Sequence, residues 1–225
     1  MAAPSNPFES HVRHLSGVIP NPDLIFNLLQ DIDWYPFPLR KGKNSSRTLC
    51  CHNIQELDVG IILYRWLLSF FKAINVKVEI LGMFGNYYPD GNATLPYHQD
   101  QYGSDVVSLS FGSKRLFNFK TGWNGAVVKP SFYLCNGDML IFDEYMNKNY
   151  HHGIPLQKQI TEPRINITCF VKFSACGNPD GRQASLAKNE INPFTVNVDL
   201  TKIPSLSIDS TDDEKLIEEI RTLSL

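Results

Sequence analysis

The chain has 225 residues, of which 43% are hydrophobic and 12% aromatic. This length and composition suit one well-packed domain with an extension and exclude two large domains. The formal net charge is -2, so any contact with nucleic acid has to come from a local basic patch. The five cysteines are odd in number and none form a CxxC pair, which argues against a disulfide framework or a zinc ribbon and favours a reducing compartment.

The chain does not open with a basic segment followed by an apolar core, as a secretory signal would. Its longest apolar run, near residues 61–71, is interrupted by Arg65 and is too short to span a bilayer. We therefore expect an intracellular monomer in the cytoplasm, the nucleus or both, with no membrane partner.

Two helices are predicted in the first third of the chain. Residues 21–23 (Asn-Pro-Asp) are typical of a helix start, and apolar residues recur at helical spacing as far as Trp34. Two prolines at positions 36 and 38 end this helix. The polar, basic stretch 39–47 is predicted to be a loop, and a second helix follows at about 59–74.

Beyond Asn75 the apolar period changes to two, which indicates strands. Strands are predicted at 76–80, 106–111, 116–120, 139–142 and 165–173. Two helices followed by many short strands indicate an α+β domain built around a β-sandwich. From Gly177 the sequence has the composition of a linker, followed by one more predicted strand at 194–198 and an acidic helical segment at 212–223.

The segment His98-Gln99-Asp100 places two metal-ligand side chains two residues apart. On an extended chain these positions point to the same face. A second histidine from another strand would complete a two-His-one-carboxylate set, which leaves coordination positions open for a co-substrate and dioxygen on iron(II). His151 and His152 are the candidates for that third ligand, and a surface turn with solvated histidines is the alternative interpretation.

Arg164, Asn166 and Thr168 alternate with isoleucine, so all three polar side chains face one way on a strand. A guanidinium directed into a sandwich needs an anionic partner, because its burial otherwise costs several kcal/mol. A dicarboxylate co-substrate would supply that partner with bidentate geometry. A nearby protein carboxylate is the alternative partner.

Together these pieces resemble the AlkB-like dioxygenases, which are iron(II)- and 2-oxoglutarate-dependent nucleic-acid repair enzymes. The resemblance spans about residues 15–175. The segments that carry it, in order, are Asn86-Tyr87-Tyr88-Pro89-Asp90-Gly91, His98-Gln99-Asp100, Ser108-Leu109-Ser110-Phe111-Gly112, Phe117-Asn118-Phe119-Lys120, Leu134-Cys135-Asn136-Gly137-Asp138-Met139-Leu140, His152-Gly153-Ile154-Pro155 and Arg164-Ile165-Asn166-Ile167-Thr168.

The resemblance implies a double-stranded β-helix (jelly-roll) core with supporting N-terminal helices, in a domain of residues 1–176 followed by an extension of unknown role at 177–225. It implies that His98, Asp100 and His152 are the catalytic iron ligands. It also implies that Arg164 holds the distal carboxylate of 2-oxoglutarate. The side chains that would line the same pocket are Asn86, Tyr88, Asn166 and Thr168.

Two positions depart from the family pattern. Phe170 occupies the position of the family's final arginine, which helps to hold the co-substrate, and Tyr102 replaces an acidic residue near the substrate base. The basic loop, flanked by aromatic residues, matches the position of the family's nucleotide-recognition lid. Its phosphate-binding candidates are Arg40, Lys41, Lys43 and Arg47, and a solvated charged loop is the alternative.

The function that this resemblance implies is oxidative demethylation of N-alkylated bases in DNA or RNA, with dioxygen consumed. A base inside a duplex has to be flipped out or single-stranded to reach buried iron. The alternative is the same chemistry on a protein or small molecule, which Phe170, Tyr102 and the near-neutral charge favour. A non-enzymatic binding module would need no complete ligand set, and so this third hypothesis is disfavoured.

Overall fold

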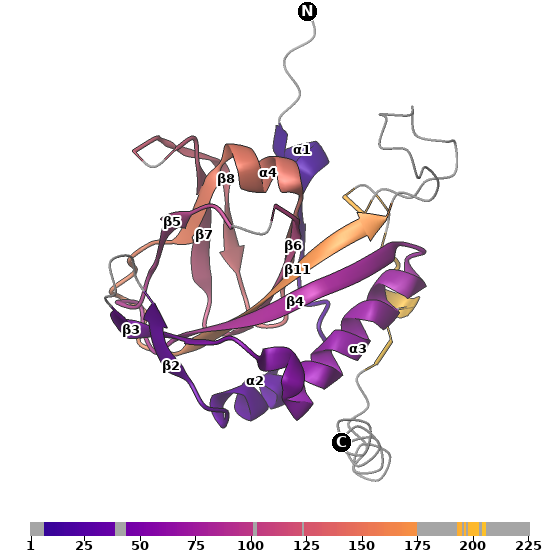
Figure 1. Ribbon diagram of the computed structural model, residues 1–225, viewed down its shortest axis with the longest axis horizontal. Helices are drawn as coiled ribbons and strands as arrows, with labels where there is room; N and C mark the ends of the chain where they lie inside the picture. The colour runs from indigo at the N-terminus through magenta and orange to yellow at the C-terminus, as the bar shows by residue number, and fades with distance from the viewer. Residues whose placement is uncertain are drawn as a thin grey trace, which may run out of the picture.

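Two antiparallel sheets lie face to face and form the body of the molecule (Figure 1). The computed structural model describes residues 7–38, 44–100, 103–122, 124–174, 193–194, 196, 198–202 and 204–205. The larger sheet has the order β1-β9-β6-β11-β4-β3-β2 and the smaller sheet the order β5-β10-β7-β8. The jelly-roll core predicted from the sequence is confirmed, although the sheets are not closed into a barrel.

The elements have the following bounds. The helices are α1 (Pro7–His11), α2 (Pro22–Gln30), α3 (Asp58–Ala73) and α4 (Glu144–Asn149), with single 3-10 turns η2 (Ile54–Glu56) and η3 (Leu200–Lys202). The strands are β1 (Val12–Leu15), β2 (Tyr35–Pro38), β3 (Asn44–Cys51), β4 (Lys77–Tyr88), β5 (Leu95–His98), β6 (Asp105–Gly112), β7 (Arg115–Lys120), β8 (Val127–Leu134), β9 (Met139–Phe142), β10 (His151–Ile154) and β11 (Arg164–Ser174).

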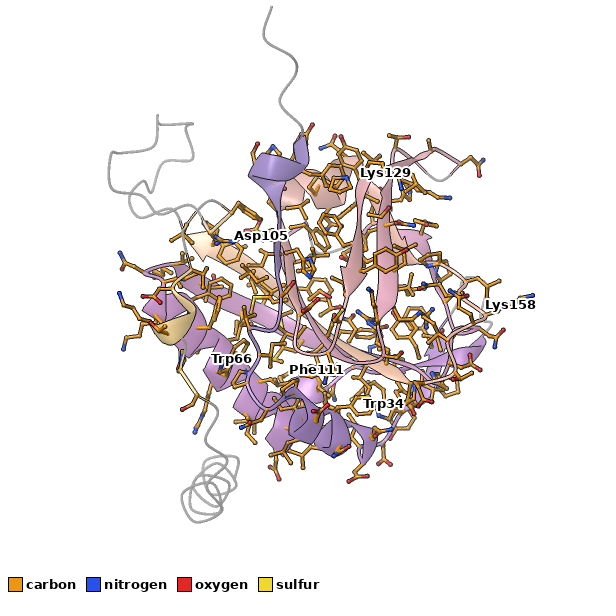
Figure 2. All side chains as sticks on the ribbon, turned by 180° about the vertical axis from the view of Figure 1, so that it is seen from behind. Trp34, Trp66, Asp105, Phe111, Lys129 and Lys158 are labelled. Atoms are coloured by element: carbon orange, nitrogen blue, oxygen red, sulfur yellow. The ribbon has the colours of Figure 1, made fainter. Side chains whose placement is uncertain are left out.

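Helices α2 and α3 cover the outer face of the larger sheet (Figure 1). The buried side of α3 repeats at helical spacing through Leu63, Trp66, Leu67 and Phe70. Each fully buried side chain of this size stabilises the fold by about 1.5–3 kcal/mol. Figure 2 shows Trp66, Phe111 and Trp34 along this layer. Among the described residues, no helix is both long and apolar enough to cross a membrane.

The second core lies between the two sheets. Phe117 and Phe119 of β7 pack here against Leu140 and Phe142 of β9. Gly112 ends β6 with a positive φ of 79°, and a Cβ added there would lie 2.6 Å from the Phe26 ring on α2. Only glycine tolerates that combination of backbone angle and close approach. The strand therefore turns directly beneath the helix.

Several predicted elements agree with the structure, and three do not. The two helices and the strands at 106–111, 116–120, 139–142 and 165–173 are present within a few residues. The predicted loop 39–47 is wrong from residue 44, where β3 begins. The prolines at 36 and 38 were predicted only to end a helix, but they lie in β2. Since β2 is an edge strand, it tolerates residues that have no backbone N–H to donate.

The third difference concerns the C-terminal extension. Phe194, Val196 and Val198 do not form the predicted strand. They pack instead against the core beneath α3, and the indole nitrogen of Trp66 donates to the Pro204 carbonyl at 3.3 Å. The domain boundary after residue 176 stays a prediction, and the predicted helical segment 212–223 lies outside the described residues.

Arg115 is fully buried and ties the loop after β4 to the smaller sheet. Its guanidinium donates to the carbonyls of Asp90 (2.9 Å), Ala93 (2.7 Å) and Pro155 (3.2 Å). Replacing it by methionine keeps the volume but leaves these buried carbonyls without their donor. We predict that Arg115→Met lowers the free energy of unfolding by about 3 kcal/mol, measured by urea denaturation.

The neighbouring Lys114 provides the matched control, because its side chain is exposed. Lys114→Met should change the free energy of unfolding by less than about 0.5 kcal/mol. Equal denaturation midpoints for the two variants would contradict the structural role of Arg115.

Candidate functional site

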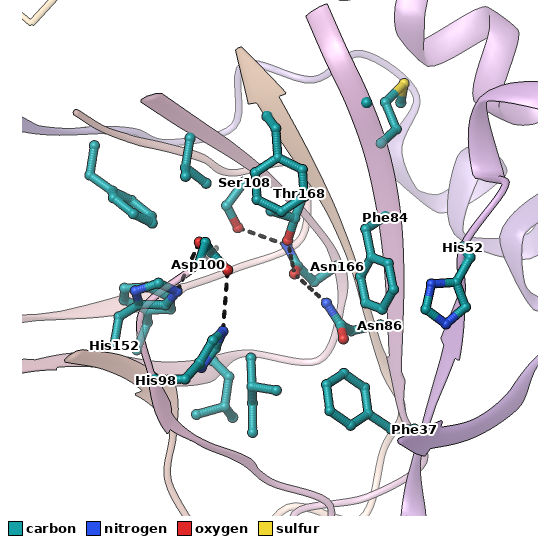
Figure 3. Close-up of a pocket in the computed structure, with 18 of the residues that line it drawn as sticks. Phe37, His52, Phe84, Asn86, His98, Asp100, Ser108, His152, Asn166 and Thr168 are labelled. Carbon is teal, nitrogen blue, oxygen red and sulfur yellow. Dashed lines mark hydrogen bonds and ion pairs between the residues drawn. The ribbon is translucent and has the colours of Figure 1, made fainter. Parts of the chain in front are cut away.

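Three candidate metal ligands converge between the two sheets (Figure 3). His98 ends β5 and pairs across the strands with His152 of β10, so both imidazoles point to the same face. Asp100 follows β5 by two residues. One ligand atom from each side chain lies within 4.8 Å of the other two. The sequence prediction that these three side chains come together agrees with this geometry.

Asp100 lies between the two imidazoles. Its Oδ1 is 3.3 Å from His98 Nε2 and its Oδ2 is 3.3 Å from His152 Nε2. Burial alone would raise the pKa of Asp100, but the two imidazoles, His152 foremost, outweigh burial and hold this pKa well below its usual range. The carboxylate is therefore ionised, as a metal ligand must be.

Each histidine is oriented for the same role. The Nδ1 of His98 donates to the Pro96 carbonyl at 2.9 Å, which directs Nε2 at Asp100. Burial lowers the pKa of His98, but Asp100 outweighs burial and raises it above its usual value. Burial lowers the pKa of His152 despite the neighbouring carboxylate. Its neighbour His151 is not part of the cluster and pairs across the sheet with Lys120. The ligand choice between the two histidines therefore favours His152.

The fit of this cluster to a metal rests on its donor set and on one buried atom. Asp100 Oδ2 is inaccessible to solvent, and apart from His152 Nε2 at 3.3 Å it has no polar partner among the residues that the structure describes. A buried acceptor without a donor is costly. Two imidazole nitrogens and one carboxylate are the ligand set of non-haem iron(II) oxygenases, so His98, Asp100 and His152 fit iron(II).

A side-chain clamp that the sequence did not reveal fixes the backbone of Asp100. Asn147 of α4 is buried. Its Oδ1 accepts from the Asp100 backbone nitrogen at 2.8 Å, and its Nδ2 donates to the Asp100 carbonyl at 3.3 Å. Gln99 adds a bond from Nε2 to the Lys148 carbonyl. Residues 98–100, which carry two of the candidate ligands, are thereby held against α4. This helix directly precedes the strand that carries the third candidate, His152.

Arg164 opens β11 and lines the same cavity. Its side chain is 1% exposed, and Nη2 donates to Ser110 Oγ at 3.0 Å. The Nε and Nη1 atoms have no hydrogen-bond partner among the described residues, and no ion pair of that part of the chain includes Arg164. Burial lowers the pKa of Arg164 to about 10, so the guanidinium remains charged at neutral pH.

A buried cation without a counter-ion is expensive, and an incoming carboxylate would compensate it. The Tyr88 ring, whose centroid is 5.3 Å from the guanidinium carbon, lines the same end of the cavity. This charge, the free donors and the facing metal cluster fit a dicarboxylate that reaches from Arg164 to the metal. The alternative partner considered from the sequence, a nearby protein carboxylate, is absent among the described residues.

The polar side chains beside the metal cluster form one network (Figure 3). Asn166 Oδ1 accepts from Asn86 Nδ2 at 3.3 Å and from Thr168 Oγ1 at 3.0 Å. Its Nδ2 donates to Ser108 Oγ at 2.7 Å. All of these residues line the cavity, as does Phe170 in place of the family's second arginine. The predicted pocket residues are thus brought together.

The cavity has a volume of about 710 Å³, within the usual range for small-ligand sites. Its other side is aromatic: the Phe84 ring lies 4.9 Å from the His52 ring and 6.2 Å from the Phe37 ring (Figure 3). None of these three was predicted from the sequence as a site residue, because they come from three separate strands or strand ends. Their position in the cavity emerges only when β2, β3 and β4 pair.

The predicted substrate residues are not placed by this geometry. Arg40, Lys41, Lys43 and Tyr102 lie outside the described residues. Arg47 falls within β3, but its side chain is not described. Their roles stay predictions.

Comparison with known proteins agrees with this site. Residues 79–169 match the family model of the 2OG-Fe(II) oxygenase superfamily. The DNA oxidative demethylase ALKBH2 of Bos taurus is 30% identical over 95 residues, which are 37% of this chain and 34% of that protein. The Homo sapiens ALKBH2 is 30% identical over 94 residues. This chain thus matches about a third of the length of these curated relatives.

Solved structures resemble the fold. The non-heme alpha ketoglutarate dependent epimerase SnoN from nogalamycin biosynthesis superposes with a TM-score of 0.51 at 12% identity, covering 92% of this chain and 95% of that one. A prolyl hydroxylase from Trichoplax adhaerens superposes with a TM-score of 0.50 at 12% identity, covering 72% and 84%. At this identity the likeness concerns the fold alone.

Residues 79–169, which include His98, Asp100 and His152, thus resemble the 2OG-Fe(II) oxygenase superfamily, and the site fits iron(II) and 2-oxoglutarate. The partial similarity to the ALKBH2 proteins supports a likeness to the AlkB-like members of that superfamily. Iron(II) and 2-oxoglutarate, which the sequence predicted as cofactor and co-substrate, are confirmed for the family.

The Asn147 clamp generates a first test of the site. Asn147→Ala removes both bonds to the Asp100 backbone, so the carboxylate loses its fixed orientation. We predict an iron(II) affinity about 10- to 100-fold lower, measured by anaerobic titration calorimetry. Asn149→Ala is the control on the same helix, since Asn149 is exposed and donates to the Tyr145 carbonyl rather than to Asp100. Equal affinities in the two variants would contradict the role of the clamp.

Arg164 generates a second test with two opposite readouts. Arg164→Met should weaken 2-oxoglutarate binding at least about thirtyfold, because the anion loses its buried partner. The same change should leave the ligand-free protein as stable or more stable, because an unpaired buried charge is removed. Calorimetric titration and urea denaturation measure the two effects. Arg164→Lys, which keeps the charge but not the bidentate guanidinium, should bind 2-oxoglutarate with intermediate affinity. Unchanged 2-oxoglutarate binding in Arg164→Met would contradict the role of Arg164 in holding the co-substrate.

Proposed function

We propose that this oxygenase demethylates N-alkylated bases in DNA or RNA by oxidation. The observation that carries the proposal is the aromatic side of the cavity, formed by Phe37, His52 and Phe84 opposite the metal cluster. Flat rings suit a flat heterocycle, because base–aromatic stacking depends on the π-face and tolerates any base. The similarity to ALKBH2, a DNA oxidative demethylase by name, supports the same substrate class.

The residues would divide the work as follows. His98, Asp100 and His152 would hold iron(II), and Arg164 would hold the distal carboxylate of 2-oxoglutarate. When bound, these groups together with dioxygen supply oxidation of a substrate C–H bond, coupled to conversion of 2-oxoglutarate to succinate and carbon dioxide. An N-methyl group becomes N-hydroxymethyl, which leaves as formaldehyde and returns the proton to the base nitrogen.

The remaining side chains would orient and shield the reaction. Asn86, Asn166 and Thr168 would fix the co-substrate side of the cavity through their shared hydrogen bonds. Phe117 and Phe142, which line the cavity beside His152, would exclude water from the reacting atoms. A base has to leave its stack to reach this depth. The proposal places the enzyme where nucleic acid is found, in the nucleus, the cytoplasm or both.

The test is formaldehyde release from methylated single-stranded oligonucleotides by iron-loaded protein with 2-oxoglutarate, with base identity read by mass spectrometry. We expect turnover by the parent and none by His152→Ala, which also should not bind iron(II). His151→Ala, at the neighbouring position outside the metal cluster, should retain both. The absence of turnover on every methylated DNA and RNA oligonucleotide, with 2-oxoglutarate consumption unaffected by nucleic acid, would refute the proposal and indicate a protein or small-molecule substrate.

A further inference from the structure

The outer face of the smaller sheet carries positive charge without negative charge. None of its four strands contains Asp or Glu, and neither does any position from Val106 to Gly137. The chain as a whole has 23 acidic residues against 21 basic ones. Acidic side chains are therefore excluded from one region of a molecule that is otherwise slightly acidic.

Three lysines belong to this face. Lys120 of β7 alternates with the buried Phe117 and Phe119, so it points away from the core. Lys129 of β8 is exposed (Figure 2), and so is Lys114 at the turn before β7. None of the three takes part in an ion pair within the described part of the chain, where the ion-paired lysines are Lys148 and Lys202.

Tyrosines lie beside two of these lysines. The Lys120 ammonium lies 4.1 Å from the centroid of the Tyr97 ring, and the Lys114 ammonium lies 4.8 Å from that of the Tyr133 ring. Tyr133 is 53% exposed, so part of its ring is open to solvent beside Lys114. Aromatic rings interleaved with unpaired cations are the components of a surface that binds single-stranded nucleic acid.

The dimensions and position of the face suit a polymer. Lys114 and Lys120 are six residues apart along the chain, which spans about 20 Å in a strand. One strand of a B-form duplex carries about six phosphates over that length. Strand β5 forms an edge of the sheet (Figure 1). Its Tyr97 contacts Lys120 on the outer side, and its His98 belongs to the metal cluster. A chain lying on the outer face could thus pass around this edge towards the cavity.

We propose that this outer face, defined by Lys114, Lys120, Lys129, Tyr97 and Tyr133, binds the phosphate backbone and bases of single-stranded nucleic acid. This inference rests on the proposed function, which supplies the polymer, and adds a second contact surface outside the cavity. The face holds the strand without regard to sequence, since lysines contact phosphates and tyrosines stack on any base.

The test compares two triple variants of equal charge change. The face variant is Lys114→Gln, Lys120→Gln and Lys129→Gln. The control is Arg65→Gln, Lys72→Gln and Lys77→Gln, three exposed cations along α3 and the start of β4. Binding of an unmethylated, fluorescently labelled single-stranded oligonucleotide is measured by anisotropy at several salt concentrations, after circular dichroism has shown that both variants melt like the parent.

We expect the face variant to bind at least about tenfold more weakly, with a slope of log K against log salt reduced by about 2 to 3. The control should bind like the parent. Tyr133→Ala alone should weaken binding about fivefold. Equal affinity and slope for the face variant and the parent would overturn the proposal. So would polyglutamate of matched charge competing as well as the oligonucleotide, which would indicate an acidic polypeptide partner.

Turnover separates this inference from the proposed function. The face variant should demethylate a methylated mononucleoside at the parental rate, while its KM for the methylated oligonucleotide rises. If the parent demethylates nothing, the proposed function fails, yet the anisotropy comparison with unmethylated oligonucleotide still decides whether the face binds nucleic acid.

Discussion

The alternation of side chains along β11 is the constraint on which both the fold and the site depend. This strand pairs with β4 on one side and β6 on the other along most of its length. Ile165, Ile167 and Cys169 enter the core beneath the helices, while Arg164 and Asn166 line the cavity. A shift of register by one residue would exchange these two sets. The burial of the apolar residues of β11 therefore fixes where the Arg164 guanidinium lies.

Asp100 and Arg164 are both buried charged groups of the site, and they differ in whether the protein supplies a partner. Asp100 stays ionised because the imidazoles outweigh the effect of burial, whereas the described residues supply no anion to Arg164. The ligand-free protein thus carries a buried cation at a cost in stability. Such a cost is typical of a site whose ligand completes the charge balance, because binding energy then comes largely from compensating the protein's own unpaired group.

The sequence predicted the parts of the site that depend on strand periodicity. His98 and Asp100 are two residues apart, and Arg164, Asn166 and Thr168 alternate with isoleucine, so local spacing alone places each set on one face. The family resemblance then selected His152 over His151, which spacing could not do. The long amphipathic α3 was equally predictable, because its seven buried positions recur at helical spacing.

What the sequence did not predict depends on pairing between distant segments. Strands β5 and β10 have four residues each and no clear alternation, so their existence follows from the contacts that they make with each other and with β7. β2 contains two prolines, which in the sequence predict the end of a helix. The position of β2 at the edge of the larger sheet accommodates both prolines. Asn147 resembles any polar helix residue until the fold brings it against Asp100, 47 residues away.

The two faces of the smaller sheet lie in different environments: one faces the cavity and the other is the outer face. His98 and His152 face inwards to the metal cluster, and their sequence neighbours Tyr97 and His151 lie on the other side of the same strands. Because successive side chains alternate between faces, a register shift that moved either histidine out of the cluster would also move its neighbour off the outer face. The metal geometry thus fixes the outer surface of β5 and β10, while the outer positions of β7 and β8, which supply Lys120 and Lys129, are free to vary in charge. The absence of acidic residues from those two strands is therefore a property that the catalytic fold does not require.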